Sequence, residues 1–312
     1  MTANPSASTQ PSVHSIDHFA LNVPSIEDAE RFYCSFGLRV EPVVAHRIEL
    51  ALYAADGHRW ARIFPAERKS LAYLSFNCFA SDFDPLCTRI AAAGADPVIG
   101  DDQDGLWFHD PDGNLLQVKI GPKTSPSSKA PSIVSGSPAD VRGAHTRSES
   151  KTVHPRRLSH VLLFTPDVLR ALDFYGKALG LRLSDKSQDI IAFTHAPHGS
   201  DHHLVAFAKS GARGWHHAAW DVDDVNMVSE GASQMSAAGY TKGWGTGRHV
   251  LGSNYFHYVE DPWGSFCEYS ADIDFVSAGC QWPAGDFSPD DSLYLWGPPV
   301  PENFVVNTEE QA

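Results

Sequence analysis

The chain has 312 residues, 42% of them hydrophobic, and a formal net charge of −14 at pH 7. Its length predicts two domains and a sizeable buried core. The acidic balance leaves no basic surface to neutralise phosphates, which excludes nucleic acid and anionic membranes as favoured partners and points to a small-molecule ligand.

Residues 1–13 form a polar N-terminal segment. They contain neither the apolar stretch of a secretory signal nor an Arg-rich amphipathic face, and no run of 18 apolar residues follows. A membrane-spanning helix needs about 20 such residues. We therefore expect a soluble, cytoplasmic protein.

An N-terminal domain is predicted at residues 14–121. It opens with an apolar strand and then a helix that a Pro begins and a Gly ends, IDHFALNVPSIEDAERFYCSFGLRV. A second strand and helix follow in LAYLSFNCFASDFDPLCTRIAAAG. The domain closes with WFHDPDGNLLQVKIG, in which Asp-Pro-x-Gly predicts a turn between two strands.

A polar linker is predicted at residues 122–156, because this stretch is rich in Ser, Pro, Gly and Lys and has no apolar period. Residues 157–274 then repeat the landmarks of the first domain, beginning with LSHVLLFTPDVLRALDFYGKALGLRL. Here Thr165 is the expected helix N-cap and Gly180 the expected stop. The tail at residues 275–312 is apolar enough to pack, as a lid or at a subunit contact.

The repeated landmarks predict an α+β fold. Each half contains two strand–helix units, so we expect four βαβββ modules in two tandem domains. Their mixed sheets curl around a concave interior, and strand residues of one parity point into it.

Histidine is concentrated in the second half of the chain. Eight of the 16 histidines lie between residues 160 and 249. Imidazoles bind metals and titrate near neutral pH, so this cluster is a first indication of a metal or proton-transfer site. The five cysteines are odd in number and form no CxxC pair, which argues against a disulfide framework or a thiolate metal site.

The repeats and the motifs LSHVLLF, GWHHAAWDV and FCEYS resemble the vicinal oxygen chelate superfamily, and the second half resembles the catalytic domain of a type I extradiol dioxygenase. The resemblance covers roughly residues 14–272. In that family two His and one Glu hold the metal and leave positions open on non-haem iron. It implies His160, His217 and Glu268 as metal ligands, and Fe(II) as the metal ahead of Mn(II).

The same resemblance implies three active-site residues that do not bind the metal. His203, in DHHLVAFA, matches a His that accepts and donates protons near the bound dioxygen. In GRHVLGSNYFHY, His249 matches a His beside the substrate oxygens and Tyr258 a Tyr that hydrogen-bonds a substrate hydroxyl. An imidazole suits proton exchange near neutral pH, and a phenol donates without ionising.

Each of two histidine doublets offers a choice, because neighbours on a strand face opposite ways. The family's register selects the second member of each pair. We therefore expect His202 and His216 on the other side of the sheet, structural or solvated.

The first half provides an internal comparison. Aligned on the same landmarks, it has His18, Tyr73 and Gln117 at the three ligand positions. A phenol and a neutral amide make a poor ferrous site, so we expect this domain to be a metal-free duplicate. Candidates for an aromatic substrate pocket are Trp215, Trp220, Trp244 and Phe256.

The resemblance implies extradiol (meta) cleavage of a catechol-type diol with O2, giving a muconic semialdehyde-type product in the degradation of aromatic compounds, by a homo-oligomer. Two alternatives remain open. One is a glyoxalase-like isomerase or transferase with Zn, Ni or Mn, which usually takes ligands from both halves of its cavity. The other is a non-catalytic protein that binds an aromatic compound. Bound metal would distinguish the enzyme from such a protein.

Overall fold

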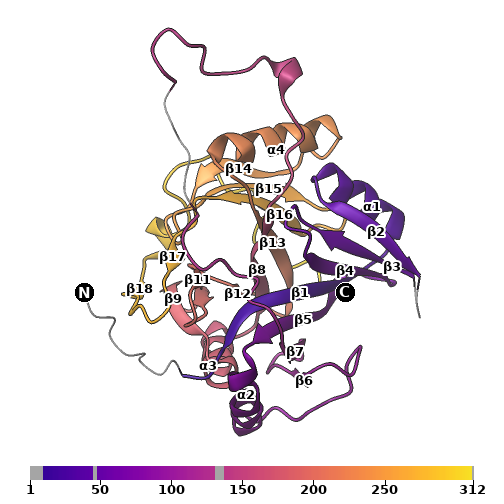
Figure 1. The fold of residues 1–312 in the computed structure, drawn as a ribbon, viewed down its shortest axis with the longest axis vertical. Helices are drawn as coiled ribbons and strands as arrows, with labels where there is room; N and C mark the ends of the chain where they lie inside the picture. The colour runs from indigo at the N-terminus through magenta and orange to yellow at the C-terminus, as the bar shows by residue number, and fades with distance from the viewer. Residues whose placement is uncertain (1–9, 45–47, 131–136, 311–312) are drawn as a thin grey trace.

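The computed structural model describes residues 10–44, 48–130 and 137–310 (Figure 1). Within these ranges, no helix is long and apolar enough to cross a lipid bilayer. The α+β class and the two tandem domains with mixed sheets are confirmed.

Seven of the described strands form the first sheet, in the spatial order β2-β3-β4-β1-β5-β7-β6. Helix α1 (Ile26–Ser35) follows β1, and helix α2 (Ala80–Ala92) follows β5. The central pair β1 and β5 is antiparallel, and each of them has a parallel partner, β4 and β7. The strands are β1 (Val13–Val23), β2 (Arg39–Val44), β3 (Ile48–Tyr53), β4 (Arg59–Pro65), β5 (Ser70–Cys78), β6 (Leu106–His109) and β7 (Leu115–Ile120).

The second module departs from the expected pattern, because only β6 and β7 follow α2. Residues 93–105 form no strand. They include three Gly, one Pro and four Asp, which are the residue types least favoured in strands. This module is therefore βαββ.

Nine described strands form the second sheet, in the order β14-β15-β16-β13-β8-β12-β10-β9-β18. The antiparallel pair β8 and β13 occupies the place that β1 and β5 have in the first sheet, with β12 and β16 as parallel partners. Helices α3 (Val168–Leu179) and α4 (Val225–Ala237) follow β8 and β13. The strands are β8 (Arg157–Thr165), β9 (Arg182–Ser187), β10 (Ile191–His195), β12 (Val205–Lys209), β13 (Gly214–Asp221), β14 (Gly243–Arg248), β15 (Tyr255–Glu260), β16 (Phe266–Ala271) and β18 (Gly285–Asp286), and a separate pair consists of β11 (Ser200–Asp201) and β17 (Phe275–Val276).

The N-cap predicted for α3 was wrong by two residues. The carboxylate of Asp167, not the hydroxyl of Thr165, accepts from the backbone N–H of Arg170 at 3.0 Å. Thr165 precedes a proline, which favours extended backbone, and it ends strand β8. The predicted stop is confirmed, since Gly180 has a φ of 75°.

The two domains share one hydrophobic core. The ring of Phe36, after α1, stacks on Tyr269 of β16 with centroids 3.9 Å apart, and the Tyr269 hydroxyl donates to the Phe36 carbonyl at 2.8 Å. Figure 1 shows α1 beside α4 at one end of the molecule and α2 beside α3 at the other. Packing across the boundary therefore fixes the second sheet relative to the first.

Where the structure describes it, the predicted linker is largely exposed, but its end packs. Val153 is buried, and its N–H donates to the Gln234 side chain of α4 at 2.7 Å. The tail is bound along much of its length. Its strands β17 and β18 pair with β11 and β9. Near its end, Glu309 lies 2.7 Å from the buried ammonium group of Lys69, which the first domain contributes.

Candidate metal centre

Three adjacent strands bring the predicted ligands together. His160 lies on β8, His217 on β13 and Glu268 on β16. Ala219 of β13 is paired with His160 on one side and with Glu268 on the other, and His217 lies two residues before Ala219. Residues two apart on a strand share a face, and the short Ala side chain leaves space between its longer neighbours. The three predicted ligands therefore converge on one point.

The ligand atoms form a compact buried group. The Oε2 atom of Glu268 lies 3.4 Å from His160 Nε2 and 3.4 Å from His217 Nε2. All three side chains are buried, and their potential ligand atoms lie within 4.8 Å of one another. In the described part of the chain, this is the set of His, Cys, Asp and Glu side chains whose geometry could hold a metal ion.

Hydrogen bonds identify the nitrogen that His217 presents to the site. His216 Nε2 donates to the Phe304 carbonyl at 2.7 Å. Burial lowers the pKa of His216 to about 4, so at neutral pH its other nitrogen, Nδ1, carries a lone pair. That Nδ1 lies 2.6 Å from His217 Nδ1, which must therefore be the donor. Burial also lowers the pKa of His217 well below 6.5, which leaves its Nε2 unprotonated toward Glu268.

The orientation of His160 follows the same logic. The Ser159 hydroxyl donates to the Asp201 carboxylate at 2.9 Å. Its oxygen is then free to accept from His160 Nδ1, at 3.2 Å. With the ring proton on Nδ1, His160 also presents an Nε2 lone pair to the site.

These atoms fit a divalent metal. His217 Nε2 and Glu268 Oε2 are buried and have no hydrogen-bond partner among the described residues. Buried polar atoms without a partner are rare in folded proteins. Here two imidazole lone pairs and a carboxylate oxygen face one another, an arrangement that repels itself without a cation. Two His and one carboxylate are the donor set of metal sites that keep positions open.

Glu268 is oriented by Asn254, a residue that the sequence reasoning missed. The buried Asn254 amide donates to Glu268 Oε1 at 2.9 Å and to Ser270 Oγ at 2.9 Å. One carboxylate oxygen is thereby fixed while the other is left for the metal. The Asn lies in an irregular segment before β15, where no strand period indicates the direction of its side chain.

We expect Asn254→Ala to weaken metal binding about 10- to 100-fold, because partners that orient ligands contribute that much to affinity. Competition with a chelator measures the change. Ser253→Ala is the matched control, since the hydroxyl of Ser253 bonds to Asp274 and not to Glu268. Equal affinities of the wild type and Asn254→Ala would contradict the role given to this amide.

The three predicted non-ligand residues also lie at the site. The ring of His203 lies against that of His160, with centroids 3.9 Å apart. Tyr258 lies 2.9 Å from His249 Nε2, and His249 Nδ1 donates to the Leu293 carbonyl at 2.7 Å. Burial lowers the pKa of His203 and of His249. Burial, and then the charge of Glu268, raises the pKa of Tyr258 well above 10. These groups therefore face the site uncharged at neutral pH.

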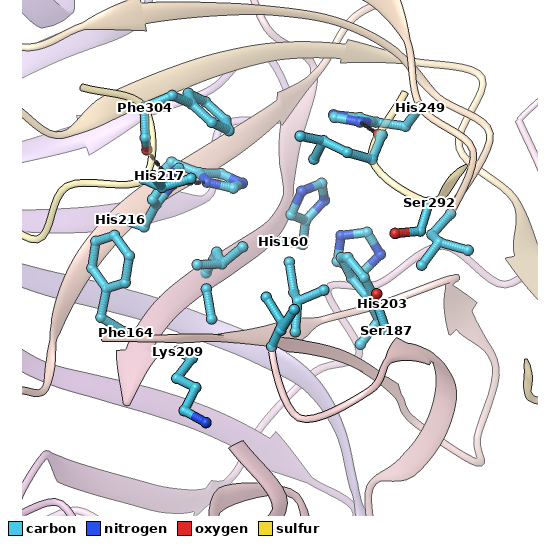
Figure 2. A pocket seen from close by; sticks show the side chains of 18 of the residues that line it. His160, Phe164, Ser187, His203, Lys209, His216, His217, His249, Ser292 and Phe304 are labelled. Atoms are coloured by element: carbon cyan, nitrogen blue, oxygen red, sulfur yellow. Dashed lines mark hydrogen bonds between the residues drawn. The ribbon is translucent and has the colours of Figure 1, made fainter. Parts of the chain in front are cut away.

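A cavity of about 420 Å³ opens from this cluster. Figure 2 shows His160, His203, His217 and His249 around it, with Phe164 and Phe304 on its wall. Its polar end is the part lined by the histidines, Asn254 and Tyr258. The apolar wall includes Leu162, Phe164, Ile191, Phe193, Phe304 and Val305.

The model of the Glyoxalase/Bleomycin resistance protein/Dioxygenase superfamily matches residues 15–118 and 157–269. The chain belongs to this superfamily. It is 66% identical to metapyrocatechase 2 of Cupriavidus necator over 310 residues, which are 98% of this chain and 95% of that protein.

Solved structures share the fold. A Mn(II)-bound glyoxalase from Novosphingobium aromaticivorans is 25% identical, with a TM-score of 0.73 and 94% of both chains covered. An extradiol ring-cleaving dioxygenase from B. fuscum is 19% identical, with a TM-score of 0.73, and the match covers 97% of this chain and 84% of that one. The similarity to the B. fuscum dioxygenase supports the two-domain architecture alone.

The prediction for one doublet was wrong. His216 does not face the other side of the sheet: it lines the same cavity as His217. The pairing of β13 with β8 shifts register between Trp215 and His217, and this irregularity breaks the alternation on which the prediction depended. His202 is structural rather than solvated, because it is buried and bonded to Asp185.

The four aromatic candidates for the pocket wall were also wrong. Trp215 and Trp220 belong to the main core, and Trp244 and Phe256 to a second cluster beside the site. Phe164 lines the cavity instead. It lies four residues after His160 on β8, and the shared parity could have identified it.

The corresponding positions of the first domain carry a hydrogen-bond network. His18 Nε2 lies 2.9 Å from the Tyr73 hydroxyl, and Arg62 donates to the same hydroxyl at 2.7 Å. The Gln117 amide donates to Asp102 at 3.1 Å. A fixed guanidinium charge beside Tyr73 would repel a cation, in keeping with a metal-free domain, which stays a prediction.

Proposed function

We propose that the chain is an extradiol dioxygenase that opens the ring of a catechol-type diol with O2, giving a muconic semialdehyde-type product. His160, His217 and Glu268 hold the metal. One observation carries the proposal: potential ligand atoms of His160, His217 and Glu268 lie within 4.8 Å of one another beside a cavity, next to uncharged His203, His249 and Tyr258. The high identity to a metapyrocatechase along almost the whole chain supports it.

Fe(II) is the metal that we propose, with Mn(II) as the second choice, since two His and one carboxylate are the ligand set of non-haem Fe(II) oxygenases. When bound, the ion supplies open positions for the diol and O2 and couples their electron transfer.

The residues around the metal position the substrate and handle its protons. His203 accepts a proton from a substrate hydroxyl and later returns it, as an uncharged imidazole can. Tyr258 keeps its proton: its hydroxyl donates to His249 Nε2, and it turns to donate a hydrogen bond to a substrate oxygen when the diol binds. The apolar wall holds the ring and excludes water from the polar end. The tail contributes Phe304 and Val305 to this wall, so we propose that it acts as a lid.

The ligand set favours the dioxygenase over a glyoxalase-like isomerase. All three ligands lie on the second sheet, whereas the isomerase reading expects ligands from both halves. A non-catalytic binding protein gives no reason for a buried carboxylate facing two imidazole lone pairs. Assembly into a homo-oligomer stays a prediction.

The decisive experiment is anaerobic reconstitution with Fe(II), followed by metal analysis and aerobic addition of catechol, 3-methylcatechol or 2,3-dihydroxybiphenyl. We expect about one iron per chain, as the one set of three ligands among the described residues predicts, with O2 uptake and a yellow product. Stoichiometric zinc or nickel without O2 uptake would favour the isomerase, and no bound metal would favour a binding protein.

A further inference from the structure

A chain of hydrogen bonds runs behind His203, on the side away from the cavity. His203 Nδ1 lies 3.1 Å from His202 Nδ1, and His202 Nε2 lies 2.8 Å from Asp185 Oδ2. All three side chains are buried, with exposed fractions of 3% for His203, 0% for His202 and 6% for Asp185. Water therefore does not supply alternative partners.

The chemistry of these groups determines which atom donates in each of these hydrogen bonds. A carboxylate can only accept, so His202 donates to Asp185 through its Nε2–H. A neutral His202 then has no proton on Nδ1, and that atom must accept from His203 Nδ1–H. The remaining nitrogen of His203, Nε2, is left with a lone pair.

The tail fixes the carboxylate. The backbone N–H of Gly285 donates to Asp185 Oδ1 at 2.7 Å, and the indole of Trp282 lies 3.3 Å from Oδ2. Oδ2 is thus directed at His202. The doublet His216–His217 is built in the same way, with the Phe304 carbonyl in the place of the carboxylate.

We propose that Asp185 and His202 are positioning residues that fix the tautomer of His203, so that its Nε2 is the atom that accepts the substrate proton. This inference rests on the proposed function. In the step, the substrate O–H bond breaks, its electron pair stays on oxygen, and an Nε2–H bond forms while Nδ1 keeps its own proton. The same proton later leaves from Nε2. His202 and Asp185 exchange none.

Asp185→Asn should reverse the direction of the hydrogen bonds from His203 through His202 to residue 185, because it replaces one carboxylate oxygen by an NH2 group. Because the Gly285 N–H, at 2.7 Å, is a closer donor than the Trp282 indole, at 3.3 Å, the amide oxygen takes the place of Oδ1. The amide NH2 then faces His202, and the hydrogen bond from Trp282 is lost. His202 then accepts a hydrogen bond at Nε2 and donates one from Nδ1 to His203 Nδ1. His203 therefore carries its proton on Nε2, toward the cavity. We expect kcat to fall by about 100-fold or more, the contribution of a well-placed general base, with KM and iron content unchanged.

Nitrogen-15 NMR of the histidine-labelled, metal-free full chain reads the tautomer directly. We expect His203 to have a protonated Nδ1 and a bare Nε2 in the wild type, and the reverse in Asp185→Asn. Asp286→Asn is the matched control: Asp286, on the neighbouring strand β18, accepts from the Gln188 N–H and from Lys186, and no histidine is among these partners. It should change neither the tautomer nor kcat.

The outcomes separate this inference from the function on which it rests. A wild-type His203 with its proton on Nε2 overturns it, whether or not the variants fold. So does a reversed tautomer in Asp185→Asn without a loss of kcat. The expected tautomer in a protein that cleaves no catechol would refute the dioxygenase while leaving the hydrogen-bond chain established.

Discussion

Glu268→Gln should lose the metal and, at the same time, make the metal-free protein more stable. The amide oxygen can keep the hydrogen bond from Asn254, now 2.9 Å from Glu268 Oε1. The amide NH2 then takes the position of Oε2, 3.4 Å from both ligand nitrogens. Two lone pairs that face a carboxylate in the wild type instead receive N–H donors.

The expected effects are large and of opposite sign. Loss of a ligand should lower metal affinity by more than about 100-fold, beyond what loss of an orienting partner does. New hydrogen bonds to buried acceptors should raise the free energy of unfolding of the metal-free form by about 1 kcal/mol. Metal analysis after dialysis measures the loss of metal. Thermal unfolding of the wild type and of Glu268→Gln, each in the presence of a chelator, measures the change in stability.

The wild type with bound metal is the control for this variant, because the ion should raise its melting temperature. Such a rise should not occur when the metal is added to Glu268→Gln. A variant that retained about one metal ion per chain would show that Glu268 is not needed as a ligand, and the proposed centre would be wrong.

The convergence of the three candidate ligands was predictable, because the family resemblance names their positions and strand parity gives the direction of their side chains. His160, His217 and Glu268 each lie on a strand whose neighbours follow from the repeated strand–helix order. Their convergence needs only that β16, β13 and β8 are adjacent. The fold class was predictable for the same reason, since the repeat is visible in the Asp-Pro-x-Gly turns.

What the sequence did not reveal depends on long-range contacts. The side chain of His216 lines the cavity because of a register shift between two strands, which no single strand encodes. Two of the groups that set histidine tautomers are backbone carbonyls of the tail, at Leu293 and Phe304. Any residue at these positions supplies a carbonyl, so residue type carries no sign of the role.

The tail therefore does more than cover the cavity: its backbone also orients histidines of the site. Through Phe304 it determines, by way of His216, which nitrogen of the candidate ligand His217 faces Glu268, and through Leu293 it determines which nitrogen of His249 faces Tyr258. Its end is held at the domain boundary, where Glu309 contacts Lys69 and the backbone N–H of Trp215. The tail thus joins the first domain to the hydrogen bonds that set histidine tautomers in the second.

His203→Gln should lower kcat by about 100- to 10,000-fold, the usual contribution of a general acid–base group. Iron content should stay the same, because His203 is not among the three proposed ligands. The substrate should still bind, since the apolar wall is intact. Steady-state kinetics with 3-methylcatechol, together with metal analysis, measure both quantities.

His257→Gln is the matched control for the same substitution. His257 lies on β15 next to Tyr258, and strand neighbours point to opposite faces, so its ring is directed away from the cavity. Its kcat should equal that of the wild type. If His203→Gln kept full kcat, proton transfer would have to occur without this ring. If it lost iron, His203 would instead be a ligand, and the division of the site into three metal-binding and three non-binding residues would fail.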